Sequence, residues 1–124
     1  MLIDPVRKLG NRLLSVEKPA RYVGGEVGII RKSADTGFRI ALSFPDLYDI
    51  GMSNFSIRIL YTLLNRLEGV SCERVFAPAP DFEALLKREG LPLYTLENGI
   101  SLSEFDILSF SIGYELSATS LLTI

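Results

Sequence analysis

The fold is decided by residues 38–69, which read FRIALSFPDLYDIGMSNFSIRILYTLLNRLEG. In residues 38–44, large apolar side chains alternate with Arg, Ala and Ser, which predicts a strand with one fully buried face. From Ser53 onward the apolar spacing becomes helical, with Ser53 or Asn54 as the N-cap and Gly69 just past the end. We expect this helix to pack on the sheet through Phe55, Ile59, Leu60, Leu63, Leu64 and Leu67.

Strand and helix patterns alternate along the rest of the chain. Residues 27–32 predict a strand that forms a hairpin with residues 38–44 through a turn at 33–37. Further short strands are expected at 72–77, 92–96 and 107–112. A helix begun by Asp81 and ended by Gly90, and a turn at Asn98-Gly99, lie between them. This order predicts an α/β, Rossmann-like three-layer fold with a mostly parallel sheet and an antiparallel N-terminal hairpin strand.

The sequence divides into two regions. Residues 4–18 have helical apolar spacing that Pro19 must end, so residues 1–22 are interpreted as an N-terminal helix and connector. Residues 23–124 then form the Rossmann-like domain. The helical pattern from Tyr114 onward has no stop signal, so we expect this domain to be truncated at its C-terminus. The mean hydropathy of +0.27 fits an apolar surface covered by further polypeptide or by a second copy in a homodimer.

The composition argues against several kinds of chemistry. The chain has 124 residues, no His, one Cys and a net charge of −2. Without His there is no Ser-His-Asp triad, and Cys72 alone cannot build a zinc site, an iron–sulfur cluster or an intrachain disulfide. We therefore expect no catalytic and no metal-binding residues in this chain. The charge predicts no nucleic-acid partner, and the sequence predicts a cytoplasmic protein without a membrane segment.

Candidate binding residues follow the carboxyl ends of the predicted strands, where open α/β sheets bind ligands. Backbone N–H groups at the start of the helix near Ser53 could hold a phosphate or carboxylate, although the same cap would form for stability alone. Asp46 and Asp49 offer an acid–base pair, but aspartates at this spacing more often bond local N–H groups. The candidate ligand-binding set is Asp46, Tyr48, Gly51, Ser53, Asn54, Pro78, Ser111 and Tyr114.

Three ordered blocks carry a resemblance to a known family. They are residues 18–26 (KPARYVGGE), 44–53 (FPDLYDIGMS) and 73–78 (ERVFAP). From Lys18 to its end, the chain resembles the N-terminal part of a family of bacterial radical SAM proteins. In that family, a cobalamin-binding-like, Rossmann-type domain precedes a radical SAM barrel.

The resemblance implies a non-catalytic accessory domain that positions cobalamin or substrate for a radical SAM barrel in the same polypeptide. The [4Fe–4S] cluster and S-adenosylmethionine would belong to that barrel, because the chain lacks the motif CxxxCxxC. Asn54 stands where the family pattern has His, and Ser56 where it has Gly. Cobalamin would therefore bind without a protein imidazole on cobalt. The alternatives are a stand-alone cobalamin- or nucleotide-binding module and an architectural, dimer-forming domain.

Overall fold

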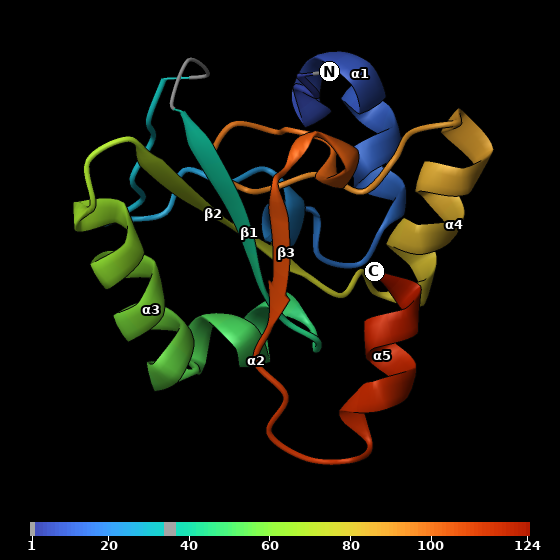
Figure 1. Cartoon of the computed structure of the whole chain (residues 1–124). Helices are drawn as coiled ribbons and strands as arrows, with labels where there is room; N and C mark the ends of the chain where they lie inside the picture. The colour runs from blue at the N-terminus through green and yellow to red at the C-terminus, as the bar shows by residue number, and fades with distance from the viewer. Residues whose placement is uncertain (1, 34–36) are drawn as a thin grey trace.

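A parallel three-stranded sheet forms the centre of the protein. The computed structural model describes residues 2–33 and 37–124. The strands are β1 (Phe38–Phe44), β2 (Val70–Phe76) and β3 (Ile107–Phe110), in the order β2-β1-β3 (Figure 1). In the central strand, Ile40 lies in register with Cys72 on one side and with Ile107 on the other. The α/β class and the parallel sheet predicted from the sequence are confirmed.

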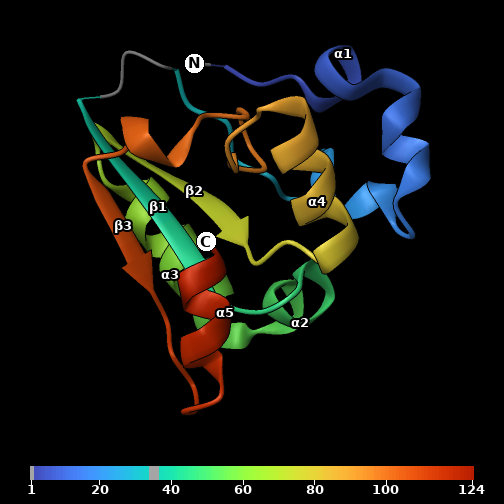
Figure 2. The same cartoon turned by 90° about the vertical axis from the view of Figure 1, so that its right-hand side faces the viewer.

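Helices cover both faces of the sheet. The helix α3 (Phe55–Arg66) lies on one face, and α4 (Pro80–Glu89) and α5 (Ser117–Thr123) lie on the opposite side (Figures 1 and 2). A short helix that the sequence patterns do not predict, α2 (Tyr48–Ser53), occupies the passage from β1 to α3. None of the helices in the described ranges is long and apolar enough to cross a membrane.

The N-terminal region is more broken than a single helix. It consists of α1 (Pro5–Leu9) and the 3-10 segments η1 (Gly10–Ser15) and η2 (Pro19–Tyr22). A third 3-10 segment, η3 (Leu102–Glu104), precedes β3. Tyr22 stacks on Phe82 of α4 with ring centroids 3.6 Å apart, and Leu9 and Leu13 join the same core.

Local sequence signals set several helix ends. The side chain of Asn54 accepts the Ile57 N–H at 3.0 Å, which satisfies a backbone donor that has no partner within α3. Gly90 ends α4 in the left-handed conformation with φ of 65°. Asp81, in contrast, is not the N-cap of α4, because the helix already begins at Pro80 and Ala79 occupies the cap position.

Two predicted strands are absent from the structure. Residues 27–32 form no strand, so the antiparallel hairpin with β1 is wrong; residues 34–36 of its turn lie outside the described residues. The backbone N–H of Ile30 instead donates to the Tyr61 hydroxyl at 2.7 Å. Residues 92–96 form only an isolated bridge between Tyr94 and Ser101.

The predicted buried face of α3 is also wrong. Its buried side chains are Ile57, Tyr61 and Asn65, with Leu64 half-buried. The predicted stripe is largely solvent-exposed, from 40% for Leu60 to 72% for Phe55. The helix carries apolar residues on two sides, and its rotation is fixed by polar contacts that the apolar spacing does not reveal. The side-chain amide of Asn65 donates to the Cys72 carbonyl at 3.0 Å and accepts the Cys72 N–H at 3.0 Å.

Candidate functional site

The strand order places a crevice between the carboxyl ends of β1 and β3. The chain leaves β1 toward β2 on one side and later returns to β3 on the other, so the order reverses at β1. Ligands of open α/β sheets bind at such a reversal, beyond the carboxyl ends of the strands. Asp46 follows β1, and Ser111 and Tyr114 follow β3.

Three of the predicted residues meet at this position. The Tyr114 hydroxyl donates to the Asp46 Oδ2 at 3.4 Å, which joins the two strand ends. The other carboxylate oxygen of Asp46 accepts the N–H of Leu47 at 2.8 Å. The Ser111 N–H donates to the Ser43 carbonyl at 2.9 Å, which extends the ladder between β1 and β3 past the last residue of β3. We call Asp46, Ser111 and Tyr114 the switch-point edge.

Two other predicted residues pack on Phe76 at the end of β2. The ring of Tyr48 meets that of Phe76 edge to face, with centroids 5.9 Å apart. A Cβ at Gly51 would lie 2.2 Å from the Phe76 ring, so only glycine fits at this point of α2. Burial raises the pKa of Tyr48 to about 12, which keeps its hydroxyl protonated. Both positions serve packing between α2 and the sheet.

The remaining three predicted residues have local structural roles. The Ser53 hydroxyl donates to the Asp49 carbonyl at 2.9 Å, within α2. Asn54 caps α3, and Pro78 is buried in the connection from β2 to α4. The side chains of Ser53 and Asn54 are thus bonded within their own helices, and Pro78 is buried, although all three follow strand ends in the sequence.

Asp49 is engaged by cations. Its Oδ2 lies 2.5 Å from the Arg21 Nη2 and 3.5 Å from the Lys18 Nζ. The hydrogen bond from the Arg21 guanidinium lowers the pKa of Asp49 below its ordinary value. These ion pairs tie α2 to the N-terminal region.

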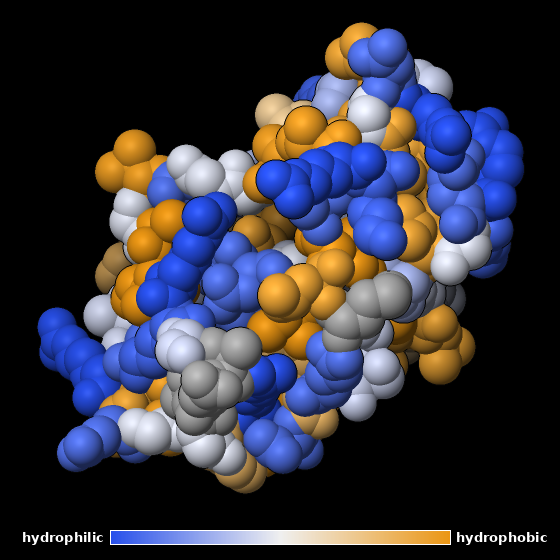
Figure 3. Space-filling view, turned by 90° about the horizontal axis from the view of Figure 1, so that it is seen from above, coloured by the Kyte–Doolittle hydropathy of each residue, from blue (hydrophilic) through white to orange (hydrophobic). Residues whose placement is uncertain are grey.

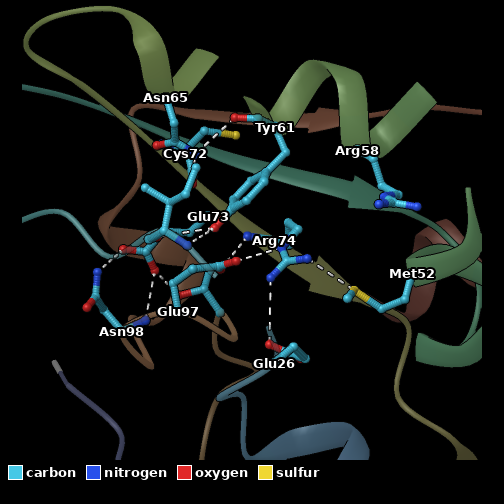
Figure 4. A network of polar contacts seen from close by, with 12 residues as sticks. Glu26, Met52, Arg58, Tyr61, Asn65, Cys72, Glu73, Arg74, Glu97 and Asn98 are labelled. Atoms are coloured by element: carbon cyan, nitrogen blue, oxygen red, sulfur yellow. Dashed lines mark hydrogen bonds and ion pairs between the residues drawn. The ribbon is translucent and has the colours of Figure 1, made fainter. Parts of the chain in front are cut away.

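A buried polar cluster that the sequence patterns did not predict lies beside β2 (Figure 4). The Arg74 Nε lies 2.6 Å from the Glu97 Oε1, and the Arg74 backbone N–H donates to Oε2 at 2.7 Å. The guanidinium also lies 4.3 Å from the centroid of the Tyr61 ring and 3.7 Å from the Glu26 carboxylate. Burial raises the pKa of Glu97, and Arg74 opposes this change by stabilising the carboxylate. The signal in the sequence was the adjacent pair of charges, Glu73 and Arg74, inside a strand.

Glu73 forms the second half of this cluster. Its carboxylate accepts hydrogen bonds from the Thr95 hydroxyl at 2.5 Å and the Asn98 side-chain amide at 2.6 Å. The Leu96 N–H donates to the Arg74 carbonyl at 3.0 Å. These bonds hold residues 94–98 along the outer edge of β2, so the cluster has a structural explanation.

A cavity of about 560 Å³ opens at the other end of the sheet. It lies between the N-terminal residues 2–8 and residues 94–99, and Figure 3 views the molecule from this end. The cavity wall includes Arg7, Lys8 and Arg31, but the Arg7 side chain is 89% exposed and extends into solvent. Glu97 also lines the cavity, and its buried carboxylate is paired with Arg74.

The described residues offer no metal centre. No group of three or more His, Cys, Asp or Glu side chains is placed to hold a metal ion in the described ranges. Cys72 is fully buried, and burial raises the pKa of its thiol to about 12. A thiol in this state is a poor ligand for an iron–sulfur cluster.

Comparison with known proteins assigns the family. The family model described as radical SAM proteins, N-terminal, matches residues 56–124, more than half of the chain. The chain belongs to this radical SAM N-terminal family. No curated protein and no solved structure matches it. In this radical SAM N-terminal domain the matched residues run from α3 to α5, so they include Ser111 and Tyr114 and leave Asp46 outside.

Proposed function

We propose that this radical SAM N-terminal domain is a non-catalytic accessory domain that helps to position a ligand for a radical SAM barrel in the same polypeptide. The barrel would supply the [4Fe–4S] cluster and S-adenosylmethionine, which provide the radical chemistry. In this chain the one cysteine is buried, and no histidine is present. Its contribution is therefore binding and orientation.

The observation that carries this proposal is the contact between Tyr114 and Asp46 across the strand-order reversal. Both groups can bond a ligand, because Asp46 offers a carboxylate acceptor and Tyr114 a hydroxyl that donates and accepts. Their mutual bond is long, at 3.4 Å, so a ligand can replace it at low cost. This pair is suited to a polar ligand with hydroxyl or amide groups.

Cobalamin is supported less well than a polar substrate of the barrel. The chain has no imidazole for cobalt, and the space beside Gly51 is filled by the Phe76 ring. Ser53 and Asn54, which could have approached a phosphate, bond their own helices instead. If cobalamin binds at this edge, Asp46 and Tyr114 would contact its peripheral amide groups, with no protein ligand on the metal.

The test uses the full polypeptide, reconstituted anaerobically with iron and sulfide. Formation of 5′-deoxyadenosine is measured with S-adenosylmethionine alone and after addition of the small-molecule fraction of a cell extract. We expect Asp46→Ala and Tyr114→Phe to leave the rate with S-adenosylmethionine alone within about twofold of the parent's. The increase in rate on addition of the extract fraction should fall about tenfold or more in both variants. The control is Thr62→Ala, an exposed position on α3.

Each outcome separates the alternatives. Equal stimulation in the parent and in both variants rejects a ligand role for the switch-point edge. Saturable binding of hydroxocobalamin that Asp46→Ala abolishes identifies cobalamin as the ligand. Absence of both stimulation and cobalamin binding would favour an architectural, dimer-forming domain.

A further inference from the structure

One side of α3 carries an apolar surface that no described residue covers. Three of its side chains and that of Leu67, the C-cap of α3, are 40–53% exposed, and we call them the α3 flank: Ile59, Leu60, Leu63 and Leu67. They recur at intervals of three and four residues, so they lie along one side of the helix. A contiguous apolar stripe of this kind is typical of a surface that packs against another element.

The α3 flank faces the β1 and β3 side of the sheet. Asn65, on the other side of the helix, bonds the N–H and carbonyl of Cys72. The backbone N–H and carbonyl of Cys72 point away from β1. Those of Arg74, two residues further along β2, point the same way and bond Glu97 and Leu96. Asn65 therefore leans over the outer edge of β2, which turns the α3 flank toward β3.

The sheet continues this apolar surface. Ile107 pairs with Ile40, so it lies on the same face as Leu42, which packs against α3. Ile107 is 45% exposed. No described strand pairs with the outer side of β3, which forms one border of the sheet in Figure 2. An open strand edge thus lies next to an uncovered apolar face.

The handedness of the connections determines where a further strand would go. The connection from β1 through α3 reaches β2 on one side, and that from β2 through α4 crosses the opposite face to β3. Parallel crossovers are right-handed in nearly all proteins. Because α5 lies on the same side as α4, a right-handed connection through α5 leads outward, to the open edge of β3 (Figures 1 and 2).

We propose that polypeptide following residue 124 adds a parallel strand beside β3, and that a later helix from the same polypeptide packs on the α3 flank. The sheet order would then continue from β2-β1-β3 as in flavodoxin-like sheets. The family match is to the N-terminal region of radical SAM proteins, which supports this source of the covering segment. The surface does not involve the switch-point edge, so this inference is independent of the proposed ligand.

The apolar character of the α3 flank, as well as the topology of the sheet, limits which segment can cover it. The α3 flank carries no charged side chain, whereas Arg58 and Thr62 lie on the Asn65 side of the helix, at the spacing of one face. The covering helix would therefore present its own apolar stripe. A polar or charged partner would leave this surface unmatched.

Cysteine labelling in the full polypeptide tests this arrangement. Leu63→Cys on the α3 flank is compared with Thr62→Cys, an exposed neighbour on the opposite side, and the labelled residue is located by mass spectrometry. Cys72 contributes little background, because it is buried. We expect the thiol at position 63 to react at least tenfold more slowly than the thiol at position 62. The two should react at similar rates in urea.

Two results would overturn the proposal. Equal native labelling at positions 62 and 63 would show that nothing covers the α3 flank. Protection at position 63 that disappears on hundredfold dilution would identify a second copy of the protein as the occupant. If Leu63→Cys does not fold, Leu67→Cys with Glu68→Cys as its control gives the same comparison.

Discussion

The carboxylate of Glu97 takes the place of a neighbouring strand beside Arg74. Its Oε2 accepts the Arg74 backbone N–H at 2.7 Å, as a carbonyl would in a ladder, while its Oε1 lies 2.6 Å from the Arg74 Nε. One side chain thus satisfies a backbone donor and a buried cation. Because the Leu96 N–H also bonds the Arg74 carbonyl, the outer edge of β2 is closed here without a strand.

Removing this carboxylate should strongly destabilise the protein. Glu97→Ala leaves the Arg74 guanidinium buried without its main partner, and breaking a buried pair in this way costs about 3–5 kcal/mol. The measurement is the free energy of unfolding in urea. Lys87→Ala serves as the control, because it breaks only the exposed pair with Glu83, which contributes about 0.3–0.5 kcal/mol. Similar losses in the two variants would contradict the assigned role.

The rotation of α3 predicts a large loss of stability for truncation of one of its residues and a small loss for another. Ile57 is 1% exposed, so Ile57→Ala should cost about 2–5 kcal/mol through lost burial and a cavity. Leu63 is half-exposed, so in the 124-residue chain Leu63→Ala should change stability by less than about 1 kcal/mol. Thermal unfolding of both variants checks the order. A larger loss for Leu63 than for Ile57 would mean that the helix packs through its other side.

Substitution of Gly51 should lower the stability of the protein because a side chain would clash with a neighbour, not because of backbone conformation. The added methyl of Gly51→Ala would lie 2.2 Å from the Phe76 ring, and such overpacking costs about 1–3 kcal/mol. Gly113→Ala is the matched control, since its Cβ meets only the Phe44 ring at 3.9 Å. Phe76→Leu combined with Gly51→Ala should recover part of the loss. Additive losses in the double variant would argue against a direct clash.

The ion pair of Asp49 should make stability depend on pH in the acid range. Arg21 holds the pKa of folded Asp49 below that of the unfolded chain, so the contribution is complete above about pH 4. It is lost as the pH falls through the folded-state pKa. Asp49→Asn should therefore be less stable than the parent at pH 6, with the difference vanishing in strong acid. Glu68→Gln, at an exposed position, is the control, and urea unfolding at each pH is the measurement.

The thiol of Cys72 should be unreactive in the native protein. Burial raises its pKa to about 12, so iodoacetamide at pH 8 should modify it only when the protein unfolds. Mass spectrometry after timed labelling, with and without urea, measures this. For the same reason, the 124-residue chain should acquire no [4Fe–4S] cluster on anaerobic reconstitution with iron and sulfide. Rapid native labelling, or one cluster per chain, would refute this assignment.

Much of the fold could be predicted from local patterns. The alternation in residues 38–44 predicted β1, the cap at Asn54 predicted the start of α3, and Gly90 predicted the end of α4. These signals depend on backbone geometry and hydrogen bonds within a few residues, which is why a single sequence contains them. That Asp46 and Tyr114 follow strand ends at one edge was predicted only through the rule that parallel strands bring their carboxyl ends together, and their contact is a finding of the structure.

The sequence by itself determined that this chain has no imidazole and a single thiol, and which segments could form strands and helices. Only the tertiary structure decided which side of α3 is buried and whether residues 27–32 form a strand. The predicted hairpin partner of residues 27–32 is β1, and both sides of β1 are already paired, with β2 and with β3. Apolar spacing cannot reveal either outcome, because one depends on the strand order and the other on buried polar bonds such as those between Asn65 and Cys72, 7 positions apart in the chain.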